Sequence, residues 1–310
     1  MKNKFSKKKK ILLSATVAIL LLLGSWFLTI AEELCLFSWE DIFYISALND
    51  ISYQAKNYDM SVHVIDVGKA DSIYIKCKDK HILIDAGERD IYDKVNVYLR
   101  KNNVKKLDLV ISTHPHSDHI GGMRSVLDEF TVDRFIMPVL PENILPTSKT
   151  YEKLLLKLDE KNIKVEKPVS GSSFNIGELK MDVLAPNNDY DKVNNYSVVV
   201  KATYKNKKFL LVGDAEKESE QDILKKGFDL SADVLKVGHH GSKTSTTKEF
   251  LEKINPTYAV ISVAEDKSKL PKREIINRLN YKGYIVYRTD INGTVIFLTN
   301  GDTIDVVTEK

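Results

Sequence analysis

Side chains that can bind metal ions follow three separate apolar runs of this sequence. The first group is His114-Pro115-His116-Ser117-Asp118-His119, directly after the run 107–113. The second is Asp214, which follows the run 208–212, and the third is His239-His240, which follows the run 233–237. Short apolar, β-branched runs of this kind indicate buried strands. Three ligand groups at three strand ends are hard to explain by chance, so we expect the fold to gather them into one metal site.

The first group carries the most specific signal. A loop that leaves a strand can turn alternate side chains to one side, so His114 and His116 can share one ion while Asp118 and His119, at the start of the next helix, face a second. A solvated histidine-rich turn is the alternative for a lone His-x-His pattern. The added Asp-His pair and Gly121-Gly122, which fits a tight turn into a helix, favour the metal site.

The other two groups complete a two-metal interpretation. A carboxylate at Asp214 can bridge two ions with its two oxygens, and either His239 or His240 can supply a further nitrogen. Taken singly, each has a structural alternative. A strand-end aspartate more often caps the next helix, and paired histidines can be merely structural.

The N-terminus predicts a membrane anchor. Six lysines fall within residues 1–10, and an uncharged apolar run covers 11–30. Such a run can span a bilayer core of about 30 Å as a helix and exceeds the apolar core usual in a cleaved signal peptide. The lysine cluster keeps 1–10 in the cytoplasm, so we expect a single-pass protein of the cell membrane with its folded domain outside. A secreted form, cleaved near 29–31, and a buried core helix are the alternatives.

Removing the anchor changes the charge argument. The whole chain has 46 basic and 43 acidic residues, and without the six N-terminal lysines 40 basic residues remain. The exported part is therefore slightly acidic, and the whole-chain pI of 8.5 says nothing about affinity for nucleic acid. Because Cys35 and Cys77 are the only cysteines, no disulfide framework supports the fold.

Residues 31–60 read as a juxtamembrane linker or helix, and 61–310 as the catalytic domain. The domain alternates between strand-like and helix-like runs. Strands are expected at 62–67, 72–77, 82–84, 107–113, 134–137, 178–184, 197–204, 208–212, 233–237, 259–263, 285–287 and 295–299, and helices at 91–102, 121–130, 150–161, 216–225 and 246–254. Two halves that each begin with strands and continue with a strand–helix alternation predict an α/β sandwich of two packed sheets with helices outside.

These motifs resemble the metallo-β-lactamase superfamily over roughly residues 61–300. Within it, the chain is most similar to the hydrolase domain of ComEC-type competence (DNA-uptake) proteins. The matching segments are Ile65-Asp66-Val67-Gly68 with Asp71-Ser72, Ile84-Asp85-Ala86-Gly87, the motif from His114 to Gly122, Asn194-Asn195-Tyr196-Ser197, Val212-Gly213-Asp214, and the run from Ala232 to Ser245.

The resemblance implies a four-layer αββα fold with the metals at one edge, between the sheets. It places His114 and His116 on one ion, Asp118, His119 and His240 on the other, and Asp214 as a bridge between them. His239 is then a substrate contact or proton donor, although either histidine of the pair can be the ligand, and Asp85 is a supporting aspartate beside the site. Asp118 and His239 are the expected catalytic residues. One or two Zn²⁺ ions are expected, with Mn²⁺ as the alternative.

The sequence also departs from the family pattern. No histidine lies between His119 and Asp214, so the third histidine that many members place on the first ion is absent, and Asn194 or water can take its place. Lys69-Ala70 replaces the usual Gln-Gly, and Lys269-Leu270-Pro271 stands where relatives tend to carry Gly-His-Pro. These changes bear on the substrate more than on the fold.

The ligand set implies hydrolysis by a metal-activated water rather than by a serine or cysteine nucleophile. We expect a phosphodiesterase or nuclease acting on DNA or an envelope polymer. Ser242, Lys243 and Thr244, at the entry to a helix near Thr246, can hold a phosphate together with free backbone N–H groups, the alternative being a plain N-cap at Ser245 or Thr246. Alternative functions are hydrolysis of a cell-envelope phosphodiester of the phosphocholine or teichoic-acid type, and a metal-depleted envelope binding protein.

Overall fold

The computed structural model describes residues 14, 16–26, 58–89, 92–265 and 269–310. The chain divides into two units, residues 1–50 and 51–310. In the first unit, residues 14 and 16–26 are helical, and among all described residues no helix is both long and apolar enough to cross a membrane. The basic tail, both ends of the apolar run and residues 31–57 of the expected linker lie outside the described residues, so the predicted anchor stays a prediction.

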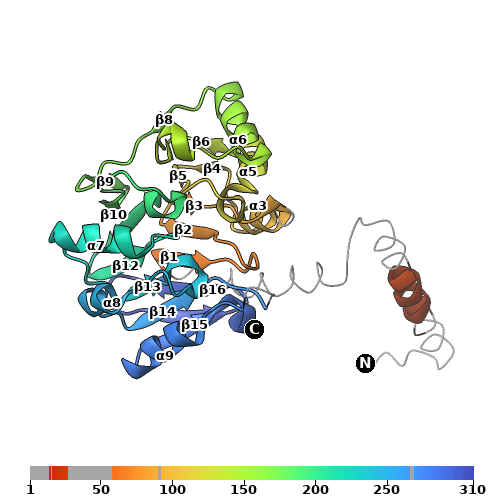
Figure 1. Ribbon diagram of the computed structural model, residues 1–310. Helices are drawn as coiled ribbons and strands as arrows, with labels where there is room; N and C mark the ends of the chain where they lie inside the picture. Colours follow the sequence, from red (N-terminus) through yellow and green to blue (C-terminus); the bar gives the residue numbers. More distant parts are fainter. Residues whose placement is uncertain (1–13, 15, 27–57, 90–91, 266–268) are drawn as a thin grey trace. The chain divides into compact units, whose positions relative to one another are not determined.

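The second unit contains two large sheets (Figure 1). The first has eight strands in the order β17-β16-β1-β2-β3-β5-β7-β8. Its strands are β1 (Met60–Val64), β2 (Ile73–Cys77), β3 (Lys80–Ile84), β5 (Leu109–Ile111), β7 (Phe135–Ile136), β8 (Val165–Glu166), β16 (Val295–Thr299) and β17 (Asp305–Thr308). Strands β17 to β3 pair antiparallel, whereas β3, β5, β7 and β8 pair parallel.

The second sheet has seven strands in the order β15-β14-β13-β12-β11-β10-β9. They are β9 (Ser173–Ile176), β10 (Leu179–Ala185), β11 (Val199–Tyr204), β12 (Lys207–Leu211), β13 (Val234–Lys236), β14 (Tyr258–Ile261) and β15 (Ile285–Arg288). Strands β9 to β12 pair antiparallel, and β12 to β15 pair parallel. A separate short pair joins β4 (Lys106–Leu107) to β6 (Thr131–Val132).

The main hydrophobic core lies between the two sheets. Val62 and Ile75 of the first sheet belong to the same buried cluster as Val200 and Phe209 of the second. The rings of Phe209 and Phe297 join the sheets, with centroids 6.4 Å apart. Burying each large apolar side chain stabilises the fold by about 1.5–3 kcal/mol. Apolar side chains at alternate positions of the strands therefore pack the two sheets together as one sandwich.

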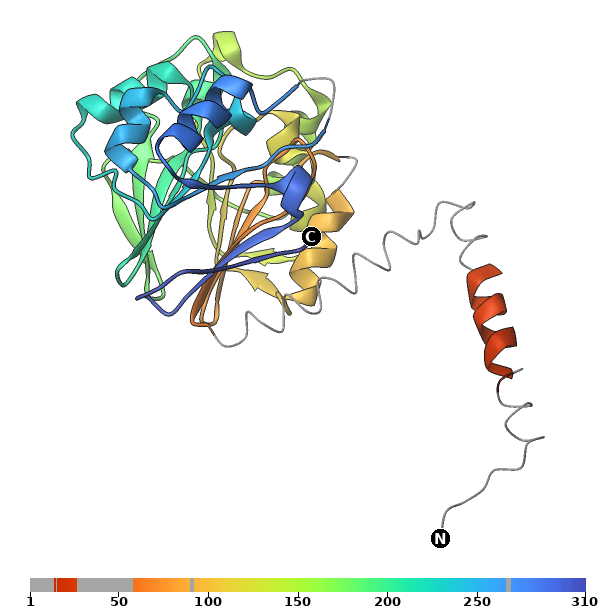
Figure 2. The same cartoon turned by 90° about the horizontal axis from the view of Figure 1, so that it is seen from below.

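Helices cover the outer faces of both sheets (Figure 2). α7 (Lys217–Lys225), α8 (Lys248–Ile254) and α9 (Arg273–Tyr281) pack on the second sheet, where Ile223, Phe250 and Leu279 join its outward residues in a buried cluster. α3 (Tyr92–Lys101), α5 (Met123–Glu129) and α6 (Lys149–Glu160) lie on the side of the first sheet, and Tyr98 of α3 contacts Tyr74 of β2. The layers thus run helix, sheet, sheet, helix, and the predicted mixed α/β fold is confirmed.

Some elements differ from the prediction. The expected helix 121–130 is shorter, α5 (Met123–Glu129), and the short helix α4 (Ser117–Ile120) precedes it before Gly121-Gly122. The sequence pattern did not predict α9, α10 (Thr289–Asn292), the strands β9 and β17, or several two-residue strands. Elements of two to four residues are too short to show a hydrophobic period, which explains most of these omissions.

The topology brings the three ligand groups to one edge of the sandwich. Strands β12 and β13 are parallel neighbours, so the loops after them, which carry Asp214 and the His239-His240 pair, leave from the same edge. The loop after β5 belongs to the other sheet. It reaches the same place because the Val198 N–H donates to the Thr113 carbonyl at 2.9 Å and joins the two sheets there.

Glu220 of the neighbouring helix α7 holds the loop between His240 and α8. The carboxylate of Glu220 accepts hydrogen bonds from the N–H groups of Thr246 and Thr247, the latter at 2.8 Å. The Ser245 hydroxyl instead donates to the Ala215 carbonyl, and Thr246 Oγ1 accepts from the Gly238 N–H. The expectation of an N-cap at Ser245 or Thr246, and of free N–H groups there for a phosphate, is therefore wrong, because a carboxylate from α7 occupies those donors.

We predict that Gly241→Ala destabilises the domain more than Gly227→Ala does. Both glycines have a positive φ, +77° and +70°, which costs a residue with a side chain about 1 kcal/mol. A Cβ at Gly241 would also lie 2.4 Å from the Cβ of Pro271, whereas nothing lies within 4 Å of one at Gly227. The clash should add about 1–3 kcal/mol. Urea unfolding of both variants measures the difference, and equal losses would contradict the clash.

The pH dependence of stability should carry a contribution from Glu220. Burial raises the pKa of this carboxyl to about 7 from its usual 4.5. The folded protein then holds a proton that the unfolded chain has lost, so this group's contribution to stability falls as pH rises from about 4.5 to about 7, by up to about 3 kcal/mol. Glu220→Gln should flatten that slope in unfolding experiments, whereas Glu249→Gln, an exposed change on α8, should keep it.

Candidate metal centre

The predicted ligands converge on Asp214, which follows β12. His114, His119, Asp214 and His240 are all at most 1% exposed. His114 follows β5, His119 lies in α4, and His240 follows β13, so three separate loops supply the buried side chains. The remaining two predicted ligands lie nearer the surface, where His116 is exposed and the Asp118 side chain is 23% exposed.

Each buried histidine has an acceptor within hydrogen-bond distance of its Nδ1 atom. His119 Nδ1 donates to Asp85 Oδ2 at 2.7 Å, and His240 Nδ1 donates to the Ser262 carbonyl at 2.9 Å. His114 Nδ1 lies 3.2 Å from Thr113 Oγ1. That hydroxyl gives its own proton to Asp85, so it accepts from His114. A histidine that donates through Nδ1 keeps the lone pair of Nε2 for a metal ion.

All three Nε2 atoms turn toward the same carboxylate. The distances to the Asp214 oxygens are 4.0 Å from His114, 3.4 Å from His119 and 3.8 Å from His240. His119 Nε2, His240 Nε2 and Asp214 Oδ1 are buried without a hydrogen-bond partner in the described part of the chain. Unsatisfied buried groups of this kind are costly, and a cation at their common focus would satisfy them. The side chains present therefore fit a metal ion.

Two overlapping groups of ligand atoms occur at this focus. His114, His119 and Asp214 form one, and Asp118, His119 and His240 form the other, with the ligand atoms of each lying within 4.8 Å of one another. His116 Nδ1 lies 3.1 Å from His114 Nε2, at the outer side of the first group. His119 thus belongs to both groups, whereas the prediction assigned it to the second ion alone. Imidazole and carboxylate donors suit Zn²⁺, Mn²⁺ and iron.

Asp85 takes the supporting position that the resemblance implies. Its carboxylate accepts from Thr113 through both the backbone N–H (2.8 Å) and the hydroxyl (2.6 Å), in addition to His119. Asp85 has a φ of +59°. An acidic side chain behind a ligand histidine fixes the orientation of its ring.

His239 lies beside Asp214 at the solvent-exposed side of the centre. The backbone of both His239 and His240 is left-handed, with φ of 49° and 51°. His239 Nε2 lies 3.6 Å from Asp214 Oδ2, while its Nδ1 lies 3.1 Å from Thr244 Oγ1 and 3.4 Å from Glu216 Oε1. The side chain is 25% exposed. A partly exposed imidazole beside the buried ligands can meet a substrate.

The predicted substrate residues divide in the structure. Ser242 and Thr244 hydroxyls lie 3.0 Å apart and contact His239 through Thr244. Asn194 Nδ2 also approaches His239, at 3.5 Å from its Nδ1, and donates to Glu216, while Asn194 Oδ1 is buried without a hydrogen-bond partner among the described residues. Lys243 is exposed.

Three charged residues of the site were assigned no role in the sequence analysis. Glu216 faces His239 and pairs with Lys192 at 2.9 Å, and Asp71 pairs with Lys236 beneath His240 at 2.9 Å. Lys236 gave a signal, since it is a lone charge in an apolar strand. Asp71 lies in one of the segments that match the family, but neither Asp71 nor Glu216 could be placed beside the centre from the sequence, because that depends on contacts between distant segments.

The close charges shift the proton affinities of the ligands. Burial lowers the pKa of His119, but Asp214 and Asp85 outweigh it and raise that pKa well above its usual value. For His240, Asp214 and Asp118 likewise outweigh burial and raise the pKa. Burial lowers the pKa of His114 well below the usual value. Without a metal ion, protons on His119 and His240 therefore balance the carboxylates.

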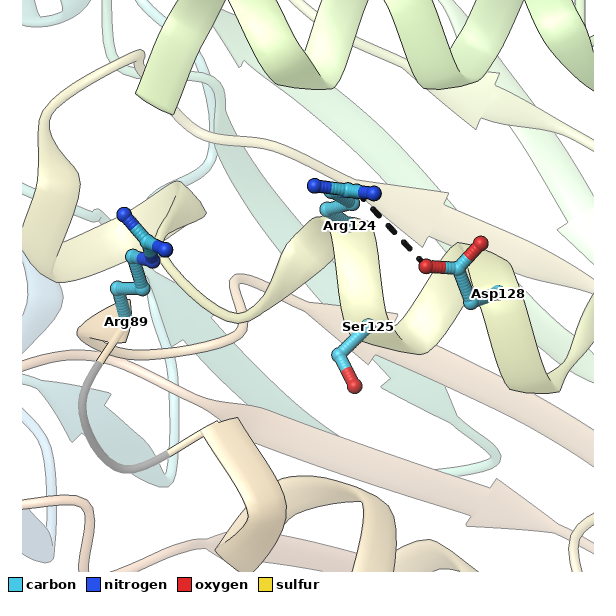
Figure 3. Close-up of a pocket in the computed structure, with 5 residues that line it drawn as sticks. Arg89, Arg124, Ser125 and Asp128 are labelled. Atoms are coloured by element: carbon cyan, nitrogen blue, oxygen red, sulfur yellow. Dashed lines mark ion pairs between the residues drawn. The ribbon is translucent and has the colours of Figure 1, made fainter. Parts of the chain in front are cut away.

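A pocket is lined by Arg89, by Gly121 directly after α4, and by residues of α5 (Figure 3). Arg89 and Arg124 line it, and Arg124 turns toward Asp128, with 3.8 Å between the paired atoms. The predicted ligands do not line this pocket. It is therefore a surface hollow near the centre rather than the metal site itself.

A model of the metallo-β-lactamase superfamily matches residues 65–265. ComE operon protein 3 of Bacillus subtilis (strain 168) is 32% identical over 263 residues, which cover 78% of this chain and 33% of that protein. Recombination protein 2 of Haemophilus influenzae is 29% identical over 245 residues, covering 76% of this chain and 28% of that protein. The chain thus spans about a third of the length of these curated relatives. The predicted similarity to ComEC-type competence proteins is confirmed.

Among solved structures, CmlA, a diiron β-hydroxylase from Streptomyces venezuelae, superposes with a TM-score of 0.51 at 11% identity, covering 74% of this chain and 53% of that chain. At this identity the likeness concerns the fold alone. The matched region 65–265 includes all six predicted ligands and the strands β5, β12 and β13 that precede them. The chain belongs to the metallo-β-lactamase superfamily and carries a hydrolase domain of the ComEC type.

Proposed function

We propose that this metallo-hydrolase is a phosphodiesterase, and that its substrate is DNA. The observation that carries the proposal is the convergence of three buried Nε2 atoms on Asp214, with His239 at the exposed side. Bound divalent ions, Zn²⁺ by default and Mn²⁺ as the alternative, would supply an activated water and offset the charge that develops on a phosphoryl group.

The residues of the chain have separate tasks in this proposal. His114, His116, Asp118, His119, Asp214 and His240 hold the metal ions. Asp118 Oδ2 lies 3.6 Å from His240 Nε2, so both atoms can reach the same ion. His239 donates a proton to the leaving oxygen, because Thr244 and Glu216 orient its ring and its side chain reaches solvent. Ser242 and Thr244 offer hydroxyl donors to a non-bridging phosphate oxygen.

The preference for DNA is supported by the relatives. Three curated proteins that match most of this chain are named ComE operon protein 3, Recombination protein 2 and Competence protein ComA. Arg89 and Arg124 also place cations beside the ligand-bearing helix α4, where a polyanion can pass. We further propose that the domain acts on the outer face of the membrane, supported by the lysine cluster and the apolar run 11–30.

A second candidate is hydrolysis of a cell-envelope phosphodiester of the phosphocholine or teichoic-acid type. The observation that favours it is the acidic balance of the chain beyond the first ten residues, with 40 basic against 43 acidic residues. An acidic domain is poorly suited to bind a long polyanion except at a local basic surface. Comparing DNA with a teichoic-acid substrate separates the two candidates.

Metal binding should release protons, because His119 and His240 have raised pKa values in the metal-free protein. As pH falls, protons occupy these nitrogens more fully, so the affinity for Zn²⁺ should fall. Titration calorimetry in two buffers of different ionisation enthalpy measures the proton count. Equal heats in the two buffers would show that the nitrogens are already free and would contradict the assignment.

His239→Asn should separate the proton donor from the ligands. General acid catalysis contributes about 10²–10⁴-fold, so cleavage of single-stranded DNA, whose leaving oxygen needs a proton, should fall by that order. Cleavage of bis-p-nitrophenyl phosphate should fall much less, since p-nitrophenolate leaves without one. Metal content measured by mass spectrometry should stay unchanged.

His116→Ala is the matched control for that experiment. It should lower metal content and slow the cleavage of both substrates, because it removes a ligand rather than a proton donor. If His239→Asn lost metal and slowed both substrates alike, His239 would be the ligand of the pair. If the full-length protein bound neither Zn²⁺ nor Mn²⁺ and cleaved neither substrate, the phosphodiesterase would be refuted in favour of a metal-depleted binding protein.

A further inference from the structure

A fully buried lysine lies directly beneath the candidate metal centre. Lys236, the last residue of β13, is 0% exposed, and its ammonium lies 2.9 Å from Asp71 Oδ2 and donates to the Val237 carbonyl at 3.0 Å. Asp71 is 1% exposed. Burying two charges is expensive, and two apolar residues often fill such a place at no loss of stability. Stability alone therefore does not explain why this ion pair is buried here.

The Lys236–Asp71 ion pair lies beside the candidate metal centre, on the side away from the metal-facing nitrogen of His240. Asp71 Oδ1 lies 3.8 Å from His240 Nδ1, on the side of the ring opposite to the metal-facing Nε2. Asp71, Asp85 and His119 also form a group whose polar atoms lie within 4.8 Å of one another. The Asp71 N–H donates to the Asp118 carbonyl at 3.0 Å, which fixes the loop before β2 against α4. Both charges therefore lie within the electrostatic reach of the ligands.

The charges around the centre can be counted. Four carboxylates surround the focus, those of Asp71, Asp85, Asp118 and Asp214. Glu216 is set apart because Lys192 balances it. Two divalent ions with a neutral bound water would neutralise the four carboxylates and leave no net charge to attract an anion. With Lys236 included, the same centre keeps one positive charge, which one phosphodiester group would balance.

We propose that Lys236 is a fixed cation of the metal centre, which cancels Asp71 and leaves the metal-loaded site with a net positive charge for a phosphodiester. The inference rests on the metal centre of the proposed function but not on DNA as the substrate. Lys236 and Asp71 touch neither substrate nor the metal-facing nitrogens, so both are positioning residues that act through charge.

The proposal predicts opposite effects for the two single variants on Zn²⁺ affinity. Asp71→Asn leaves the ammonium unbalanced and should weaken Zn²⁺ binding by about tenfold, the lower end of effects seen behind metal ligands. Lys236→Met leaves the carboxylate unbalanced and should strengthen Zn²⁺ binding by a similar factor. The double variant removes both charges and should bind Zn²⁺ as the unmodified protein does. Competition of the full-length protein with a chromophoric chelator measures all three.

A second measurement distinguishes charge from packing. Lys236→Met should raise KM for bis-p-nitrophenyl phosphate although it binds Zn²⁺ more tightly, while Lys236→Arg should restore both values. Lys201→Met is the matched control. Lys201 is also a nearly buried lysine of the second sheet, 6% exposed and paired with Asp229 at 3.1 Å, so its loss should change neither value.

The outcome that overturns the proposal is a loss of Zn²⁺ affinity in both single variants, or no change in either, since a purely structural pair has no reason to act with opposite signs. If Lys236→Met fails to fold, Lys236→Gln, which keeps a polar side chain but no charge, replaces it, and a weaker Zn²⁺ affinity in Lys236→Gln would overturn the proposal. Zn²⁺ affinity is measured without any substrate, so failure of the proposed nuclease activity would be seen separately.

Discussion

The carboxylate of Asp85 holds together the parts of the chain on which the metal centre depends. It directly follows β3, accepts two hydrogen bonds from Thr113, two residues after β5, and accepts a third from His119 in α4. Parallel pairing of β3 with β5 brings these loops side by side. The buried side chain of Asp85 thus orients the ring of His119 relative to the paired strands β3 and β5. The other loops then add Asp214 and His240 to a site whose first half is already fixed.

The sequence predicted the ligands because their signal is local. Four of the six lie within the segment from His114 to His119, directly after a buried strand, and Asp214 and His240 also follow apolar strands. The residues that surround them left no such pattern. Glu220 reaches the loop before α8 from a different helix, and Asp71 meets Lys236 from the opposite sheet. Contacts of this kind depend on the packed fold, so the sequence alone shows a charge without its partner.

The loop after β13 places His239 at the surface and His240 in the buried centre. Both have left-handed backbones, which costs residues with side chains about 1–2 kcal/mol each. The turn lets one ring enter the buried focus while the other stays at the surface, and an extended chain would send neighbouring rings to opposite sides. Glu220, Gly241 and Pro271 hold this turn in place. Part of the left-handed backbone of the domain thus lies at the two histidines that the proposal assigns to metal and substrate.

The pairing of β1 with β16 sets the order in which the domain can be completed. Met60 is opposite Thr299 and Val64 is opposite Val295, so the first sheet closes only when the last strands have emerged during synthesis. By then every candidate ligand from His114 to His240 is already outside the ribosome. The ligands therefore meet the surrounding ions before the sandwich closes over them. The availability of metal ions, rather than affinity, often decides which metal a protein binds. The compartment in which β16 pairs with β1 would therefore decide which metal ion this protein binds.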